Sequence, residues 1–183
     1  MLVINWQNFI ENKLQVKTSM TTGIFDGIHR GHQALIKRIV LYNKDYIPAV
    51  ITFRQNHKTK QKDIITFEHK LKMFEELGIK ITIIIDFTEE FKQMPGIEFL
   101  RLIKNHGNLG FFAVGSHFCC GYQLDTNTGD IKDFFDSYGI PVEIIPQVME
   151  NSMPISSSRI RTAISTGDHK IAEVMLGHNI YKK

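Results

Sequence analysis

Hydrophobic and polar positions alternate along the chain with two different periods. Short apolar runs, typical of buried strands, are separated by stretches in which apolar residues recur every three or four positions, as on one face of a helix. We expect strands over residues 19–25, 47–53, 79–85, 111–115 and 142–145. Strands that alternate with amphipathic helices predict an α/β fold: a Rossmann-like doubly wound parallel sheet of about five strands with flanking helices.

Local sequence signals set the limits of the expected helices. The first helix carries apolar residues at positions 35, 36, 39 and 40. Thr66 is the expected N-cap of the second helix and Gly78 its C′ residue, and Pro95 suits the first turn of the third. A fourth helix closes at Gly139. Two short helices, over residues 156–166 and 168–176, complete the chain.

The composition is that of a folded globular chain. Hydrophobic residues make up 43% of the 183 residues, and 13 Phe stand against 5 Pro. This composition excludes Pro-rich, collagen-like and disordered chains, because they bury too little apolar surface to offset the entropy of ordering. No linker, repeat or low-complexity tract interrupts the pattern. We therefore expect a single domain over residues 1–183.

Charge and cysteine content narrow the range of partners and compartments. The net charge of +3 is too small to indicate a nucleic-acid or membrane partner and also suits an anionic small ligand. Cys119 and Cys120 are adjacent, a spacing that hardly ever permits a disulfide. The N-terminus lacks a signal-peptide pattern, and no apolar run approaches the length of a membrane span. We expect a soluble cytoplasmic protein in a reducing compartment.

The loop between the first expected strand and helix reads Gly-Ile-Phe-Asp-Gly-Ile-His-Arg-Gly-His over residues 23–32. Ligands of open parallel sheets bind where such loops leave the carboxyl ends of strands. Gly27 and Gly31 relax the turn and let ligand oxygens approach the backbone, and the N–H groups at the helix start supply positive potential. This loop therefore predicts a phosphate site.

His29 and His32 are the candidate catalytic residues of this loop. Residues three apart in a first helical turn share one face, so both rings can donate hydrogen bonds to one anion. Such donors stabilise the negative charge that develops on a phosphate during nucleotidyl transfer. The alternatives are ordinary capping or surface residues, or a zinc site with His57 or Cys119 as third ligand. No zinc-site spacing supports the latter, so we predict no metal-ligating residues.

A second candidate anion site opens a C-terminal helix, over residues 155–161. Three consecutive serines, Ser156 to Ser158, offer hydroxyl groups at a helix N-terminus, and Arg159 and Arg161 can bind phosphate oxygens in a bidentate manner. A serine-rich cap with a basic first turn is common by itself. Its occurrence together with the first loop favours a functional interpretation.

These motifs together resemble the HxGH nucleotidylyltransferases, and within them the FMN adenylyltransferase module of the bacterial bifunctional riboflavin kinase/FAD synthetase family. The family's opening motif, G-x-F-D-G-x-H-x-G-H, is met in full over residues 23–32. Its closing motif, I-S-S-T-x-I-R, is met over residues 155–161 with Ser158 in place of threonine. Matches between the motifs follow the family's order, so the resemblance covers residues 19–181.

The resemblance implies a reaction and a role for each motif. The phosphate of FMN would attack the α-phosphorus of ATP to give FAD and pyrophosphate, with Mg²⁺ accompanying ATP. His29 and His32 would stabilise the transition state, and Arg161 would act with the serines on the β- and γ-phosphates. Asp26 would order the loop, help to place the metal, or serve as a simple turn residue. The positions expected to contact nucleotide or flavin are Gly23, Phe25, Asp26, Gly27, Gly31, Phe53, Arg54, Phe118, Ser156, Ser157, Ser158 and Arg159.

Two loops depart from the family's pattern. Where the family has Asp-Pro-His-Pro, residues 54–57 read Arg-Gln-Asn-His, and where it has x-D-F-R-F-G, residues 116–121 retain only Phe118 and Gly121. By resemblance both loops lie on the acceptor side of the cleft. The departures therefore bear on flavin specificity more than on AMP transfer, and Arg54 adds a cation that suits an anionic acceptor.

Other functions are left open by the sequence. The same chemistry could serve another phosphorylated acceptor, of the phosphopantetheine or cytidylyl type, and the altered loops also allow a nucleotide- or flavin-binding module without turnover. An RNA binder is disfavoured, because no basic stripe with interleaved aromatic residues accompanies residues 158–161. Many relatives carry a C-terminal riboflavin kinase domain that would begin where this chain stops. Unless the chain is a fragment cut at that boundary, we expect no such domain and FMN from a separate riboflavin kinase or another source.

Overall fold

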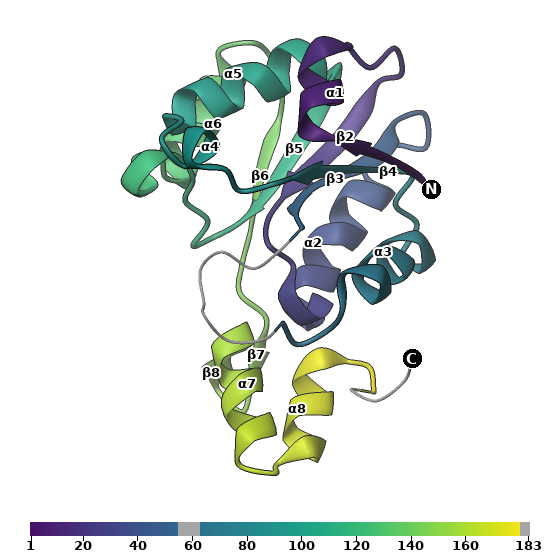
Figure 1. Ribbon diagram of the computed structural model, residues 1–183, viewed down its shortest axis with the longest axis vertical. Coiled ribbons are helices and arrows are strands. Elements are labelled where there is room, and N and C mark those ends of the chain that lie inside the picture. The colour runs from purple at the N-terminus through teal and green to yellow at the C-terminus, as the bar shows by residue number, and fades with distance from the viewer. Residues whose placement is uncertain (55–62, 180–183) are drawn as a thin grey trace.

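The computed structural model describes residues 1–54 and 63–179 and contains the expected parallel sheet. Six parallel strands form it in the order β1-β4-β3-β2-β5-β6 (Figure 1). The strands are β1 (Leu2–Asn5), β2 (Thr18–Thr22), β3 (Ile47–Phe53), β4 (Ile81–Ile85), β5 (Leu109–Gly115) and β6 (Val142–Ile145). The α/β prediction is confirmed. Because β3 and β5 lie on opposite sides of β2, the loop after β2 leaves the sheet at a switch point, where ligands of such sheets bind.

Strand β1 is absent from the sequence-based expectation, so the predicted five strands become six. It is a four-residue edge strand in which Leu2 and Val3 are 55% and 42% exposed. Its place comes from pairing with β4, where Leu2 lies opposite Ile81. A segment so short and exposed shows no hydrophobic period in the sequence. Its strand conformation depends on pairing with β4, which lies far along the chain.

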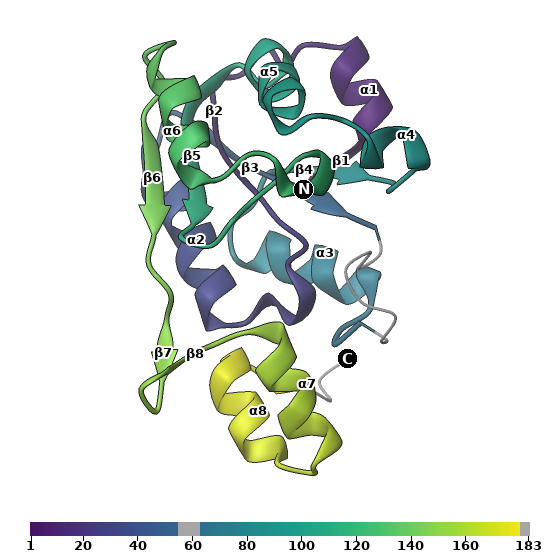
Figure 2. The ribbon, with the colours of Figure 1, turned by 90° about the vertical axis from the view of Figure 1, so that its left-hand side faces the viewer.

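The helices cover both faces of the sheet. Helices α1, α5 and α6 lie on one face and α2 and α3 on the other (Figure 2). Helices α1 and α4 were not expected, and the other six correspond to predicted helices. The helices are α1 (Trp6–Glu11), α2 (Arg30–Leu41), α3 (Phe67–Glu76), α4 (Glu89–Lys92), α5 (Gly96–His106), α6 (Thr128–Asp136), α7 (Ser157–Ser165) and α8 (His169–Leu176).

The core is divided by the sheet into two clusters. Successive strand residues point to opposite faces, so in β3 Ala49 and Ile51 belong to the cluster under α1, α5 and α6, and Val50 to the cluster under α2 and α3. Phe74 of α3 is fully buried in the second cluster. Burial on both faces explains why the central strands read as continuous apolar runs.

A separate C-terminal unit docks beside the start of α2 (Figure 1). It consists of a hairpin, β7 (Met149–Glu150) and β8 (Met153–Pro154), followed by α7 and α8, which share a small cluster around Ile160 and Leu176. Gln33 Nε2 of α2 donates hydrogen bonds to the carbonyls of Ile28 and Leu176, at 2.8 and 2.7 Å. The C-terminal helices are thereby joined to the loop that follows β2.

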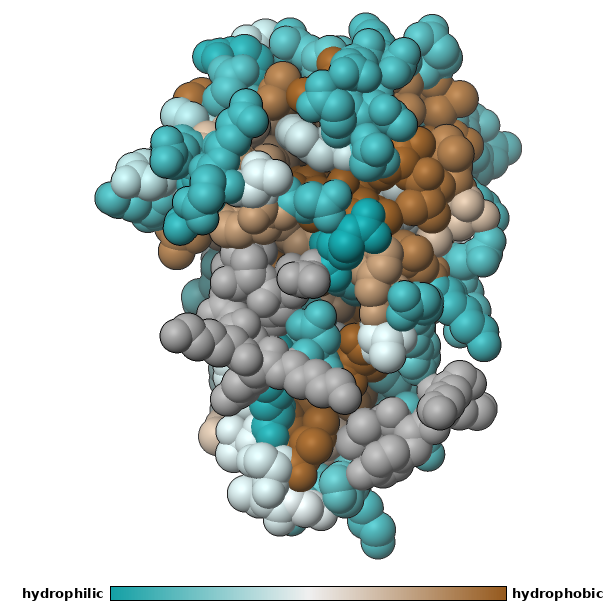
Figure 3. Space-filling view, in the orientation of Figure 1, coloured by the Kyte–Doolittle hydropathy of each residue, from teal (hydrophilic) through white to brown (hydrophobic). Residues whose placement is uncertain are grey.

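The surface is mixed in polarity. Figure 3 shows hydrophobic side chains at the surface between larger hydrophilic areas. Within the described part of the chain, every helix is too short or too polar to cross a membrane.

Gly121, in the loop after β5, has a strict backbone requirement. Its φ is +85°, and a Cβ added to it would lie 2.2 Å from the backbone nitrogen of Gly96. We expect Gly121→Ala to lower the free energy of unfolding by about 2 kcal/mol, because it combines overpacking with a left-handed conformation. Gly115→Ala is the matched control, since no atom lies within 4 Å of its added Cβ. Urea unfolding compares them, and equal stabilities would contradict the prediction.

Candidate active site

The loop after β2 is held in an unusual conformation by buried side chains. Strand β2 ends at Thr22, earlier than expected; Phe25 has a left-handed conformation, with φ 54°, and the turn Asp26–Ile28 follows it. The Phe25 ring is 1% exposed and packs edge-on against Phe74, with ring centroids 5.5 Å apart. The anchored ring fixes the position of the residues that follow, so Phe25 shapes the loop from inside the core.

The two glycines of the loop have different roles. Gly27 has a φ of +78°, and a Cβ there would meet Leu176 Cδ2 at 3.1 Å, so the expected relaxed turn is present. Gly31 lies in regular α2 geometry and does not relax a turn, which corrects that part of the prediction. A Cβ at Gly31 would lie 3.1 Å from the imidazole of His29. Its small size therefore makes room for the His29 ring.

His29 and His32 form a stacked pair. Their ring centroids are 3.6 Å apart, and the ring planes differ by 17°. His29 is the N-cap of α2, and its Nδ1 accepts a hydrogen bond from the His32 backbone N–H at 3.3 Å. In the neutral His29 ring the proton is therefore assigned to Nε2, which makes that nitrogen a donor. The expected clustering of the two rings is present, with His29 one position outside the first turn.

Both imidazoles are neutral at pH 7. Burial lowers the pKa of His29 from 6.5 to about 4. Burial also lowers the pKa of His32 well below 6.5, and repulsion from the protonated form of His29 and from Lys70 lowers it further. His32 Nδ1 is buried without a hydrogen-bond partner among the residues that the structure describes. The pair can thus offer an anion neutral N–H donors rather than full positive charges.

Lys70 is a buried cation of the site that the sequence did not indicate. Its side chain is on α3, the residue is 5% exposed, and Nζ donates hydrogen bonds to the carbonyls of Ile24 and Phe53 at 3.2 and 2.8 Å. Burial lowers the Lys70 pKa, against the opposing charges of Asp63 and Asp26. The ammonium joins the carboxyl ends of β2 and β3. A lysine within the apolar stripe of α3 was the available signal.

The second motif meets the first one. Ser156 is the N-cap of α7 and accepts a hydrogen bond from the Arg159 backbone N–H at 3.3 Å. Ser157 Oγ donates to the Asp26 carbonyl at 3.0 Å, and Arg161 Nη2 forms an ion pair with the Asp26 carboxylate. The histidine loop and the arginine, 135 residues from Asp26, therefore converge on one end of the sheet, as the sequence predicted.

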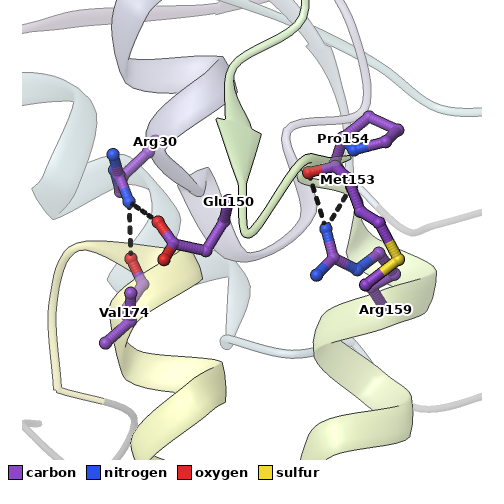
Figure 4. Close-up of polar contacts among 6 residues, drawn as sticks. All are labelled: Arg30, Glu150, Met153, Pro154, Arg159 and Val174. Atoms are coloured by element: carbon purple, nitrogen blue, oxygen red, sulfur yellow. Dashed lines mark hydrogen bonds and ion pairs between the residues drawn. The ribbon is translucent and has the colours of Figure 1, made fainter.

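Two arginines of the motifs hold the C-terminal unit together (Figure 4). Arg30 Nη1 lies 2.5 Å from Glu150 Oε2 and 3.4 Å from the carbonyl oxygen of Val174. Arg159 Nη1 donates to the carbonyls of the two β8 residues, at 2.9 and 2.6 Å. The Arg159 guanidinium, which was expected to bind phosphate, thus donates to the backbone, and the neighbouring Ser158 is exposed. Phosphate contact by Arg159 and Ser158 stays a prediction.

The residues expected on the acceptor side lie at or after the ends of β3 and β5, the two strands that flank β2. Phe53 ends β3, and its ring lies 5.8 and 5.9 Å from those of Phe87 and Phe91. Arg54 Nε is 2.7 Å from Asp86 Oδ1, so the added cation already has a carboxylate partner. Phe118, after β5, packs against the larger core cluster. Gln55, Asn56 and His57 lie outside the described residues.

Comparisons with known proteins identify the family. Residues 11–159 match the family described as FAD synthetase. The chain is 30% identical to an FAD synthetase of Listeria monocytogenes over 178 residues, which are 93% of this chain and 72% of the relative. It is 29% identical to a bifunctional riboflavin kinase/FMN adenylyltransferase of Bacillus subtilis, over 92% of this chain and 56% of the relative.

A solved structure shares the whole fold. It is described as a macrolide-efflux protein from Streptococcus pneumoniae, has a TM-score of 0.85 and 26% identity, and is matched over 97% of this chain and 60% of its own. The chain spans little more than half the length of the Bacillus relative. The fold, both motifs and the family match agree with the resemblance drawn from the sequence. The chain belongs to the FAD synthetase family of nucleotidyltransferases.

Proposed function

We propose that this chain is an FMN adenylyltransferase, which transfers AMP from ATP to FMN and releases FAD and pyrophosphate. The observation that supports it most is the convergence of the stacked His29–His32 pair with Arg161 at the carboxyl ends of the central strands. Relatives named riboflavin kinase/FMN adenylyltransferase and FAD synthetase support FMN as the acceptor. The expected organisation, one nucleotidylyltransferase domain over residues 1–183, stays a prediction, as does a separate source of FMN.

The chemical step needs no nucleophile from the protein. A phosphate oxygen of FMN attacks the α-phosphorus of ATP in line with the departing pyrophosphate, and negative charge spreads over the equatorial oxygens. His29 Nε2–H and the neutral His32 ring would donate hydrogen bonds to those oxygens. Burial keeps both rings neutral, so they would not stabilise the ground-state triphosphate as two imidazolium charges would. Their hydrogen bonds would act mainly on the charge that develops in the transition state.

The leaving pyrophosphate would be held by the start of α7. N–H groups at a helix N-terminus and a nearby guanidinium suit phosphate oxygens. Ser156 and Ser157 begin α7, and Arg161 lies one turn further on. The backbone at Gly23 and Gly27 would lie close to the nucleotide, as the family motif implies.

Mg²⁺ would reach the site with the nucleotide. Across residues 1–54 and 63–179, no group of three His, Cys, Asp or Glu side chains could hold a metal ion. The Asp26 carboxylate already accepts from the Ile64 backbone N–H and from Arg161. Mg²⁺ bound with a nucleotide usually keeps several waters and is held by substrate phosphates and one or two carboxylates, so the triphosphate oxygens would supply several of its ligands. The ion would neutralise phosphate charge.

A different phosphorylated acceptor is the second candidate. It is favoured by Arg54, which stands where the family pattern has an aspartate and which pairs with Asp86. The pair changes the charge at the end of β3, beside Phe53, without altering the histidine loop. The acceptor is therefore the part of the proposal that most needs a direct test.

Incubation with Mg-ATP and FMN is expected to yield FAD and pyrophosphate in equal amounts. Chromatography with fluorescence detection measures FAD, and a coupled assay measures pyrophosphate. Parallel incubations replace FMN with phosphopantetheine or riboflavin, or ATP with CTP. Pyrophosphate formed only with phosphopantetheine would assign the second candidate. Flavin binding without pyrophosphate release would identify a binding module instead of an enzyme.

A further inference from the structure

Asp26 joins three segments that are far apart in the sequence. Its carboxylate Oδ1 accepts from the Ile64 backbone N–H at 2.9 Å, and its Oδ2 is paired with Arg161 Nη2. Its backbone carbonyl accepts from Ser157 Oγ at 3.0 Å. One residue of the histidine loop thus contacts the segment that precedes α3 and two positions in α7.

Both partners of the Asp26–Arg161 ion pair are buried. The side chains are 4% and 13% exposed. Replacing such a pair by apolar residues is often neutral or stabilising, because burying two charges costs about as much as their attraction returns. A contribution to stability therefore explains this charged pair poorly. The pair is better explained if one partner holds the other in a fixed orientation.

The arginine is the partner with donors to spare. A guanidinium carries N–H groups on Nε, Nη1 and Nη2. Nη2 faces Asp26, and Nε is buried without a partner among the described residues. Long, flexible arginine side chains lose rotamer freedom when they bind a ligand, and a side chain already fixed loses less. Asp26 holds the guanidinium while leaving donors for an anion.

We propose that Asp26 is a positioning residue: its buried carboxylate fixes Arg161 in the orientation that contacts the triphosphate. The inference rests on the proposed function only in taking a nucleoside triphosphate as the ligand. It differs from a metal-placing role, because both carboxylate oxygens contact protein groups. It also differs from simple charge neutralisation, since an aspartate that only cancelled the arginine charge would weaken the binding of an anion.

The two effects of Asp26 have opposite signs, so one variant separates them. Asp26→Asn keeps an oxygen that can accept from the Ile64 N–H but removes the charge that orients Arg161. We expect ATP to bind roughly tenfold more weakly to this variant, and FMN to bind within about twofold of wild type. Isothermal titration calorimetry with Mg-ATP, without FMN, measures the affinity for ATP. A separate titration with FMN measures the affinity for FMN. Unchanged or tighter ATP binding would overturn the proposal.

A double-mutant cycle tests whether Asp26 acts through Arg161. In an Arg161→Met background, Asp26→Asn is expected to have no further effect on ATP affinity, because the oriented group is gone. This double variant contains neither buried charge, so it is expected to fold even if a single variant does not. If the two substitutions weaken ATP binding by factors that multiply in the double variant, Asp26 acts independently of Arg161, and the inference is overturned. If high Mg²⁺ restores the ATP affinity of Asp26→Asn, Asp26 has a metal role, and the inference is likewise overturned.

A matched control uses an ion pair remote from the site. Glu143→Gln removes the partner of Arg38 in a pair whose side chains are 37% and 40% exposed, and ATP affinity is expected to stay at the wild-type value. Thermal unfolding of each variant confirms that folded proteins are compared. A wild-type chain that binds ATP but forms no FAD would refute the proposed reaction and leave the Asp26 result standing, so the two failures are distinguishable.

Discussion

Replacing either His29 or His32 by alanine is expected to lower kcat for FAD formation by on the order of a hundredfold or more, as the loss of one preorganised donor to a developing charge does. The KM for ATP should change far less, because the rings are neutral and would act mainly on charge that appears in the transition state. Steady-state kinetics at saturating FMN measure both constants.

Capping and catalysis can be separated at position 29. His29→Asn supplies a good N-cap for α2, so it should keep the helix start intact and still lose most of kcat. His106→Ala, in the last turn of α5, is the control histidine and should leave kcat unchanged. Full activity of both alanine variants at positions 29 and 32 would remove the assigned roles.

The second large effect is on stability at acidic pH. The His29 pKa is about 4 in the folded chain and 6.5 in the reference state, so the unfolded chain binds the proton first as the pH falls. The contribution of the neutral ring is complete above pH 6.5 and is lost as the pH falls to about 4. A shift of this size corresponds to about 3 kcal/mol of unfolding free energy.

Urea unfolding of wild type and His29→Asn at several pH values tests this linkage. The free energy of unfolding of wild type should fall relative to that of His29→Asn as the pH falls through this window, because the variant lacks the titrating ring. Other titrating groups, such as Glu75, whose pKa the N-terminal amine lowers, are common to both proteins and cancel in the comparison. Two parallel curves across the window would contradict the assigned pKa.

The sheet and both motifs could be predicted because their signals are local. Strands such as β3 and β4 are buried on both faces and read as apolar runs, and the glycines and histidines of the loop lie within ten residues of one another. Segments whose structure depends on a distant partner could not be predicted. Strand β1 needs β4, and the β7–β8 hairpin, two residues on each side, has no period to detect.

The site shows the same division. The approach of Arg161 to the histidine loop was expected, but its pairing with Asp26 was not, because nothing in the sequence indicates which carboxylate a distant guanidinium will meet. Arg54 and Arg159 illustrate the difficulty. Each could be interpreted as a cation for a substrate, and in the fold each has a protein partner. The neutral state of the histidines likewise follows from burial, which is a property of the folded chain.

The docking of α7 and α8 against the loop after β2 has a consequence for biosynthesis. A nascent chain that has emerged as far as residue 150 already contains all six strands of the sheet, yet lacks Ser157 and Arg161. Domains begin to fold from the N-terminus while the ribosome is still adding residues. The sheet can therefore assemble early, whereas Ser157 and Arg161 reach Asp26 of the histidine loop only after α7 has left the exit tunnel.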